Sequence, residues 1–317
     1  MIPIEWVRRA QTYLAPYIEK TPITYDSNLD LFLKWESVQI TGSFKVRGAL
    51  NKVLNLADWE LENGLVAASA GNHGLGVAFA GAQKNASVTV FVPENASPIK
   101  IQRMQDYAAE VRKVPGGYES AERAGKIHAA AAGSTWVSPY NDGLVIAGQA
   151  TVAAEILEDI PVALTTNWIV PVGGGGLISG TAAYLHAQAS APKIFGVQAA
   201  ASPFFHSLFK RNTQSGTQDL PTLCDGLAGA IESDSMTIPL VKKYVQDIIL
   251  VEEEEIIRAM LYAWEVYGEP MEPSGAVGLA AVLSGKIPGK PASTIISGGN
   301  ITPEKHLALV KSLTKVK

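Results

Sequence analysis

One lysine, Lys45, stands in a sequence context that suits covalent chemistry. It lies between the apolar residues Phe44 and Val46, within the run TGSFKVRGA at residues 41–49. Most lysines are solvated surface charges, because the ammonium group is rarely buried. A lysine amine can also act as a Schiff-base nucleophile toward an aldehyde cofactor or a carbonyl substrate. Lys45 is therefore the first candidate for a catalytic residue.

A run of four glycines is the second candidate site, and it consists of Gly173, Gly174, Gly175 and Gly176. An apolar stretch at 170–172 precedes it, and a helical pattern follows from Leu177. Glycines let backbone N–H groups approach an anion closely, and a helix N-terminus favours negative charge. Alone, such a run would predict a tight turn, but beside a lysine site it indicates a cradle for phosphate. The Gly-Lys-Ser/Thr sequence and the acidic residue of nucleotide and dinucleotide loops do not follow it.

A third signal lies where an apolar strand meets a helical pattern, at Ser69, Ala70, Gly71, Asn72 and His73. Ser69 and Asn72 are good helix caps, so capping alone is one explanation of this segment. The alternative is functional, because a hydroxyl and the backbone N–H groups of a helix start can bind a carboxylate. We keep both interpretations at this point.

A fourth signal is the sequence Ser-Gly-Gly-Asn at 297–300, which ends another apolar strand. By itself it would predict a turn at a strand end. In combination with the lysine and the glycine run, it places a neutral hydroxyl, that of Ser297, among the candidate site residues.

The composition is that of a globular enzyme with more than one domain. The chain has 317 residues, of which 47% are hydrophobic and 18% charged, and its net charge is −4. No dense run of Lys and Arg occurs, so nucleic acid is not expected as the main partner. The single cysteine, Cys224, excludes an intrachain disulfide and is expected to be a buried packing residue. The histidines lack metal-ligand spacing, and no apolar stretch reaches the about 18 residues of a membrane span.

Short β-rich runs alternate with alanine-rich helical stretches, which predicts a parallel α/β protein. Strands are expected at 31–35, 65–69, 87–92, 110–114, 135–138, 168–172, 193–198, 248–251 and 294–297. Helices are expected at 1–11, 72–84, 98–107, 119–132, 147–159, 176–189, 252–267, 274–284 and 303–313. Parallel strands need crossover helices of this length, so doubly wound sheets are favoured over a meander. Prolines interrupt any periodicity at 200–245.

The lysine motif and its neighbours also resemble a known family. Residues 31–40 followed by TGSFKVRGA resemble the pyridoxal-phosphate (PLP) lysine site of the fold-type II enzymes. Within that group, the motifs are most similar to the serine/threonine dehydratase and serine racemase branch. Further similar stretches lie at 139–151, 224–228 and 272–276, so the resemblance covers nearly the whole chain.

The resemblance implies a fold and a division of the chain. The fold would be α/β, of the tryptophan synthase β type, with two doubly wound parallel-sheet domains and the active site between them. The large PLP-binding domain would be discontinuous, comprising residues 1–46 and 144–317, and the small domain would comprise residues 47–143.

The resemblance also implies roles for the candidate residues. Lys45 would carry PLP, and the four glycines would bind its phosphate. Asn72 would contact the phenolic oxygen of the cofactor, and Ser297 would face the pyridine nitrogen, where a neutral hydroxyl favours β-elimination. The other expected contacts are those of Phe44 and Leu177 with the cofactor, and of Ser69, Ala70, Gly71 and His73 with the substrate.

Three departures from relatives narrow the expected function. Racemases of this branch carry a second serine at the position of Ala70, and alanine has no proton to give, which disfavours two-base racemisation. The stretch 198–205 holds no carboxylate, so the divalent-cation site of some relatives is not expected. The chain ends soon after Ser297, which leaves no room for the regulatory domain of biosynthetic threonine deaminases.

The main hypothesis is a PLP-dependent ammonia-lyase that converts a β-hydroxy-α-amino acid, such as L-threonine or L-serine, to a 2-keto acid and ammonia. The alternatives are a serine- or aspartate-type racemase and a dehydratase for a larger or acidic substrate, such as 3-hydroxyaspartate, phenylserine or a hydroxyectoine-derived compound. β-Replacement is disfavoured, because relatives with that activity carry Asn-Pro and Lys-Asp-Arg where this chain has Gln39-Ile40 and Lys45-Val46-Arg47. The family suggests a homodimer. The N-terminal segment lacks the pattern of a signal peptide, so the cytoplasm is expected and a membrane is not.

Overall fold

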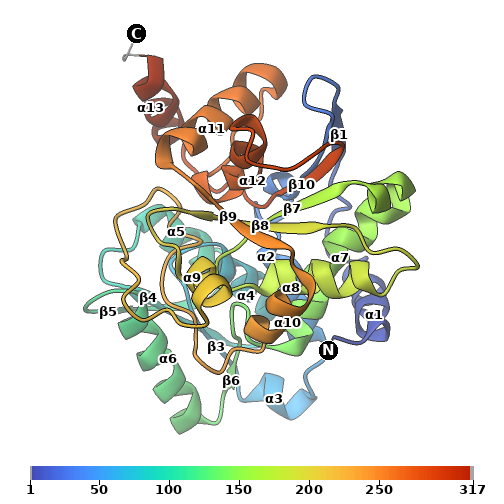
Figure 1. Ribbon diagram of the computed structural model, residues 1–317. Helices are drawn as coiled ribbons and strands as arrows, with labels where there is room; N and C mark the ends of the chain where they lie inside the picture. The colour runs from blue at the N-terminus through green and yellow to red at the C-terminus, as the bar shows by residue number, and fades with distance from the viewer. Residues whose placement is uncertain (1, 315–317) are drawn as a thin grey trace.

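Two separate β-sheets organise the chain in the computed structural model, which describes residues 2–314 (Figure 1). The first sheet has the strand order β1-β2-β10-β7-β8-β9, with β1 antiparallel to β2 and the other pairs parallel. Its strands are β1 (Ile23–Asp26), β2 (Leu31–Trp35), β7 (Asn167–Pro171), β8 (Ile194–Ala199), β9 (Asp247–Val251) and β10 (Ala292–Ile296).

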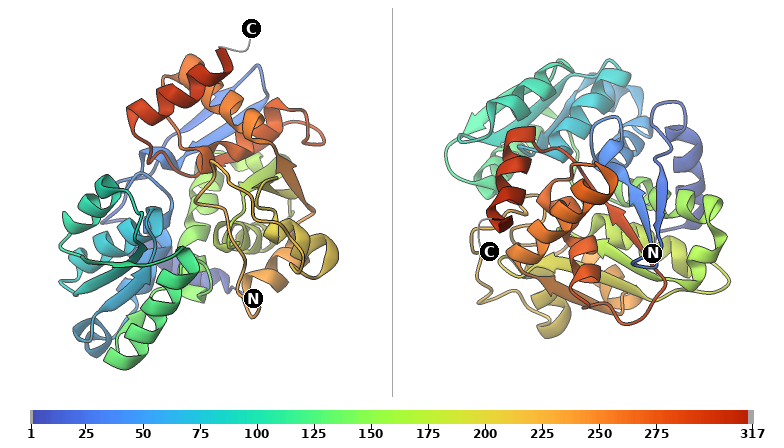
Figure 2. Two further views of the ribbon diagram at one scale, coloured as in Figure 1. Left: turned by 90° about the vertical axis from the view of Figure 1, so that its left-hand side faces the viewer. Right: turned by 90° about the horizontal axis from the view of Figure 1, so that it is seen from above.

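The second sheet is parallel and has the order β5-β4-β3-β6. In both views of Figure 2, its cyan and green segments lie beside the unit built on the first sheet. Its strands are β3 (Leu65–Ala68), β4 (Val88–Pro93), β5 (Glu110–Val114) and β6 (Thr135–Trp136).

Helices cover the sheets, and one of them joins the two units. Helix α2 (Lys45–Leu54) packs against both α4 (Asn72–Gln83), which covers the second sheet, and α7 (Gly143–Asp159). The other α-helices are α1 (Ile4–Leu14), α3 (Asp58–Glu62), α5 (Pro98–Gln105), α6 (Tyr118–Ala132), α8 (Gly176–His186), α9 (Phe204–Arg211), α10 (Thr237–Tyr244), α11 (Glu253–Tyr267), α12 (Pro273–Leu283) and α13 (Pro303–Thr314). Two short 3₁₀ helices are η1 (Glu36–Val38) and η2 (Pro161–Thr165).

Strand β7 and helix α12 are apolar on all faces because other elements pack against all of their faces. Residues 168–171 of β7 are all buried, and they show no alternation of polar and apolar side chains. This is the pattern of a parallel strand that has helices on both faces of its sheet. In α12, all residues from 273 to 281 are buried as well. The core of the first sheet therefore lies directly beneath the strand ends that carry the glycine run and Ser297.

The elements agree with those expected from the sequence, with differences at particular places. Every expected strand and helix is present, and the bounds of most differ by a few residues. The short edge strand β1 and the helix that begins at Lys45 were not expected, and α9 and α10 lie in the stretch that prolines made unreadable. The strands of the second sheet all fall within residues 65–136. The division at residues 46/47 and 143/144 stays a prediction.

Candidate active site

Lys45 lies at the N-terminus of α2, and the loop before it packs on the turn after β10. The Phe44 N–H donates to the carbonyl of Ser297 at 3.1 Å, and Ser43 forms an isolated bridge with Gly298. Gly42 has φ +74°, in the left-handed region that favours glycine, and its carbonyl accepts from Gly299 at 2.9 Å. The lysine motif and the serine turn, more than 250 residues apart in the sequence, are therefore in direct contact.

The amine of Lys45 has no ionic partner among the described residues. Its Nζ donates to the carbonyl oxygen of Pro139 at 3.0 Å and lies 5.3 Å from the centroid of the Phe44 ring. Burial lowers the pKa of the Lys45 amine to about 8, because the charged form is poorly solvated there. At neutral pH, roughly a tenth of the amine would then be in the neutral, nucleophilic form.

The glycine run connects β7 to the N-terminus of α8, as the sequence predicts. Gly175 caps the helix with φ +87°, and the hydroxyl of Thr237 holds the carbonyl of Gly174 at 2.8 Å. A side chain at Gly174 would collide with the ring of Tyr140, and one at Gly175 would approach Phe205 to 2.6 Å. The close packing thus requires glycine, and it keeps the loop's amides at the helix N-terminus, where an anion is favoured.

Pro139 and Tyr140 join the lysine to the glycine run. Pro139 accepts the hydrogen bond of Lys45, and the backbone of Tyr140 lies 3.1 Å from an ideal Cβ position on Gly176. The phenol oxygen of Tyr140 in turn accepts from the Glu232 N–H at 3.1 Å. One short segment therefore contacts both parts of the site.

Asn72, the first residue of α4, contacts the first-sheet unit through its side chain. Its Nδ2 donates to Oε1 of Glu272 at 2.6 Å, and its Oδ1 accepts from Nδ2 of Asn300 at 2.7 Å. Glu272 is buried, and burial raises the pKa of its carboxyl to about 7. Glu272 and Asn300 lie in motifs that the sequence analysis noted, but their contact with Asn72 is visible only in the structure.

The other residues of the third motif build the turn before α4. The Ser69 hydroxyl accepts from the Gly71 N–H at 3.1 Å. The His73 ring is buried, and its Nε2 lies 2.8 Å from the carbonyl of Val137. Burial, with a smaller effect of Lys45, lowers the pKa of His73 to about 3, so the ring is neutral. A carbonyl can only accept, so Nε2 carries the proton and Nδ1 is left as a buried acceptor with no partner within residues 2–314.

Ser297 directly follows β10 and is buried. Its hydroxyl makes one long contact, of 3.5 Å, with the carbonyl of Ser274 at the start of α12. A contact of that length is at the limit of a hydrogen bond, so the hydroxyl remains available to a ligand. Leu177 belongs to an apolar cluster of the first-sheet unit, and Phe44 packs against that cluster. The contacts of both residues with the cofactor stay a prediction.

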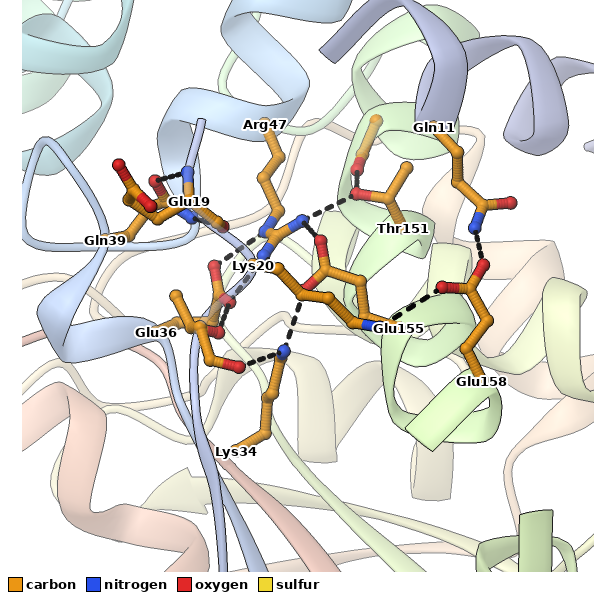
Figure 3. A network of polar contacts seen from close by, with 12 residues as sticks. Gln11, Glu19, Lys20, Lys34, Glu36, Gln39, Arg47, Thr151, Glu155 and Glu158 are labelled. Atoms are coloured by element: carbon orange, nitrogen blue, oxygen red, sulfur yellow. Dashed lines mark hydrogen bonds and ion pairs between the residues drawn. The ribbon is translucent and has the colours of Figure 1, made fainter. Parts of the chain in front are cut away.

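A buried ionic network that the sequence analysis did not predict surrounds Arg47, two residues after Lys45 (Figure 3). Arg47 is completely buried, and its guanidinium pairs with Glu36 at 2.7 Å and with Glu155 at 2.6 Å. Lys34 pairs with the same Glu155 at 2.7 Å, and Thr151 accepts a further bond from Arg47. The only sequence signal was an arginine two positions after the candidate lysine. The network ties α2 to β2 and α7.

Comparisons with known proteins identify the family of this chain. A family model described as pyridoxal-phosphate dependent enzyme matches residues 14–298. The chain is 39% identical over 328 residues to an L-threonine ammonia-lyase of Thermotoga maritima, which covers 100% of this chain and 81% of that protein. It is 35% identical over 314 residues to a serine racemase of Oryza sativa subsp. japonica, covering 94% and 91%. The structure of maize serine racemase is similar with a TM-score of 0.89 and 31% identity, over 99% of this chain and 97% of that one.

The chain belongs to the family of pyridoxal-phosphate dependent enzymes, and PLP is its cofactor. The expected fold-type II architecture is confirmed by the two sheets and by the likeness to solved racemase and threonine deaminase structures. The residues fit the cofactor, because an amine without a counter-charge suits its aldehyde and the glycine run suits its phosphate.

Two features are absent from the described residues, a metal-ligand cluster and a membrane-spanning helix. No group of three His, Cys, Asp or Glu side chains that could hold a metal ion was found in residues 2–314. No helix in that part of the chain is long and apolar enough to cross a membrane. The expectation that the enzyme needs no metal stays a prediction.

Proposed function

We propose that this enzyme is an ammonia-lyase that acts on a β-hydroxy-α-amino acid such as L-threonine or L-serine. The observation that carries the proposal is Lys45, a desolvated amine with no ionic partner among residues 2–314. The loop before it contacts the serine turn, and its Nζ contacts Pro139, whose neighbour Tyr140 packs on the glycine run. A relative that is 39% identical over 100% of this chain is named L-threonine ammonia-lyase. The net reaction releases water and then consumes water, giving a 2-keto acid and ammonia.

In this proposal the chain's own residues hold the cofactor at three points. When bound, PLP supplies an aldehyde that links to amines and a conjugated ring that accepts the electrons left at Cα. The amides of Gly173–Gly176 hold the phosphate at the N-terminus of α8. Asn72 would donate to the phenolic oxygen, and the Ser297 hydroxyl would face the pyridine nitrogen. Phe44 and Leu177 provide apolar contacts.

Lys45 is the proposed acid/base. Its pKa of about 8 leaves a useful fraction of neutral amine at neutral pH, so Nζ can take up the Cα proton of the substrate. The β-hydroxyl then leaves, and with the proton taken from Cα it makes up the water that is released. The enamine that leaves the enzyme takes up one water and gives the keto acid and ammonia.

The turn at residues 69–73 is the proposed clamp for the substrate carboxylate. Ser69 shapes the turn through its bond to Gly71, and the first-turn amides of α4, including that of His73, have no partner within the helix. The ring of His73 is committed to Val137, so we assign its contribution to the backbone N–H alone. Ala70 provides a contact but no proton.

A keto-acid assay across Ser, Thr, threo- and erythro-3-hydroxyaspartate, phenylserine and larger hydroxy amino acids tests the activity and ranks the substrates. Absence of keto acid from all of them would contradict the proposal. Chiral chromatography of recovered substrate tests the racemase alternative, which the likeness to serine racemases keeps open.

The same chromatography gives a sharper test at residue 70. We expect the unmodified enzyme to racemise its substrate hardly at all, and Ala70→Ser to raise racemisation relative to elimination. A placed acid contributes about 10²–10⁴-fold, so even a partly aligned hydroxyl should be detectable. Substantial racemisation by the unmodified enzyme would mean that another group delivers the proton.

We further propose that the enzyme is a cytoplasmic homodimer without a nucleic-acid partner or a bound metal. Family likeness supports the dimer, and the net charge of −4 argues against nucleic acid. Analytical ultracentrifugation would contradict the dimer if the holoenzyme sedimented as a monomer. Activity lost on treatment with EDTA would contradict the absence of a metal.

A further inference from the structure

A row of polar side chains runs through Asn72 and crosses repeatedly between the two sheet units. Arg103, on α5 of the second-sheet unit, donates from Nη1 to Oδ1 of Asn300 at 2.6 Å. Asn300, after β10 of the first-sheet unit, donates from Nδ2 to Oδ1 of Asn72 at 2.7 Å and to the carbonyl of Thr41 at 2.8 Å. Asn72 donates from Nδ2 to Glu272 at 2.6 Å.

The direction of every bond in this row follows from Arg103. A guanidinium only donates and does not lose its proton, so the atom of Asn300 that faces it must be the oxygen. The nitrogen of Asn300 then faces Asn72, which must present its own oxygen in return. The Thr41 carbonyl, which only accepts, requires the same orientation of Asn300. The orientation of the Asn72 amide is thus set by Asn300 and, through Asn300, by Arg103 and Thr41.

This orientation leaves one polar atom of Asn72 available. Its Oδ1 is used by Asn300, and one of the two N–H groups on Nδ2 is used by Glu272. The second N–H has no partner among residues 2–314. With the amide reversed, the atom near the site would be an oxygen, which would repel a phenolic oxygen.

We propose that Arg103 and Asn300 are positioning residues, which orient the Asn72 amide so that its nitrogen, and not its oxygen, is presented to the phenolic oxygen of PLP. The inference rests on the proposed cofactor contact of Asn72. Neither residue needs to touch the cofactor or the substrate. The cavity that both residues line has a volume of only about 10 Å³, which is about the space of one water.

Asn300→Asp is the sharpest test, because it changes one nitrogen to oxygen. The carboxylate still accepts from Arg103 but can no longer donate to Asn72 or to Thr41. We expect the absorption band of the bound cofactor to shift, and PLP to leave the holoenzyme about tenfold faster or more, since a hydrogen bond to a charged group is lost. Arg103→Met should give the same shift of the band and the same faster release of PLP. Arg103→Lys keeps a donor, so its absorption band and PLP release should be those of the unmodified enzyme.

Gln102→Met is the matched control on the same helix, because that side chain is exposed and contacts Asp106 instead. It should leave both readouts as in the unmodified enzyme. If Asn300→Asp does not fold, Arg103→Met and its Lys counterpart decide the question, since Arg103 is only half-buried. An unchanged spectrum and unchanged PLP release in Arg103→Met would overturn the inference. So would an effect confined to the KM of acidic substrates, because it would place Arg103 against the substrate.

Asn72→Ala separates this inference from the proposed function. If Asn72→Ala shifts the absorption band of the cofactor while Asn300→Asp and Arg103→Met leave it unshifted, the contact of Asn72 stands and the positioning role fails. If Asn72→Ala leaves the spectrum unchanged, the proposed role of Asn72 fails. Neither readout uses a substrate, so both remain informative whatever reaction the enzyme performs.

Discussion

Two cations lie two residues apart at the start of α2, in opposite electrostatic environments. Arg47 is fully buried between the carboxylates of Glu36 and Glu155, whereas Lys45 donates only to the carbonyl of Pro139. Burial alone would lower the pKa of Arg47, but the two carboxylates outweigh this effect and raise the pKa above its usual range. Burial without such compensation lowers the pKa of Lys45 to about 8. A buried cation with counter-charges holds structure, and one without them is left reactive.

The acidic residues repeat the contrast. Glu36 is completely buried, which would raise its pKa, but the guanidinium of Arg47 lowers it below the usual range. Glu272 is also buried, and its bond to the neutral amide of Asn72 does not prevent burial from raising its pKa to about 7. The network of Figure 3 balances Lys34 and Arg47 against two carboxylates. Lys45 and Glu272 therefore lack counter-charges that offset burial, whereas Arg47 and Glu36 offset it for each other. Within the network, burial still lowers the pKa of Lys34, and Glu155 opposes that effect only in part.

The largest expected effect comes from removing the reactive member of the contrast. Lys45→Ala should lower kcat by about 10³-fold or more, because no other positioned amine can take up the proton. Borohydride reduction followed by peptide mapping should place the pyridoxyl group on Lys45 in the unmodified enzyme. Lys84→Ala, at an exposed position after α4, is the control and should have unchanged activity. Retained activity in Lys45→Ala, or a label on another lysine, would refute the site.

The next largest effect comes from unbalancing the network. Glu36→Gln leaves two buried cations against one carboxylate, and breaking a buried pair costs about 3–5 kcal/mol. Urea unfolding should show a loss of this size, while Glu158→Gln, at a surface ion pair whose carboxylate side chain is 52% exposed, should cost less than about 1 kcal/mol. If both variants lost equally little, the contrast between network and surface would be wrong.

Glu272 should make the stability of the protein depend on pH, which tests the contrast at an acidic residue. A carboxyl whose folded pKa is raised binds more protons in the folded state, so its ionisation destabilises the protein as pH rises from about 4.5 to about 7. The difference between these two pKa values corresponds to about 3 kcal/mol at pH 8. Glu272→Gln stays neutral, so its stability relative to the unmodified protein should rise over that window. Urea unfolding of the PLP-free protein at pH 5 and pH 8 measures this, and an equal difference at both would exclude the raised pKa.

The smallest expected effect is on the reactivity of Lys45 itself. In PLP-free protein, acylation of this residue by a small electrophile should follow a midpoint near pH 8. The rate should rise about fivefold between pH 7 and pH 8, because the neutral fraction rises by that factor. Mass spectrometry of the peptide that contains Lys45 isolates its rate from those of other lysines. A rate that still rises tenfold per unit above pH 9 would show that burial does not lower the pKa.

The local features of this site could be predicted from the sequence because each depends on neighbours along the chain. The stretch around the glycine run is a strand, a turn and a helix start in succession. The apolar residues before the glycines and the helical pattern after them indicate where the strand ends and the helix begins. The same is true of the turn at 69–73, where cap residues mark the start of α4. Most strands and helices of both sheets were predicted for this reason, whereas β1 and the helix that begins at Lys45 were not. Likeness to a family then related the motifs to one cofactor.

The tertiary structure alone decided which groups meet and which are left without a partner. Asn72 reaches Glu272 across 200 positions, and Arg47 reaches Glu155 across 108. No local pattern predicts such pairs, because they form only when separate elements pack together. The pKa values of Lys45 and Glu272 have the same origin: a residue type sets the ordinary value, and the burial and counter-charges supplied by folding set the departure from it.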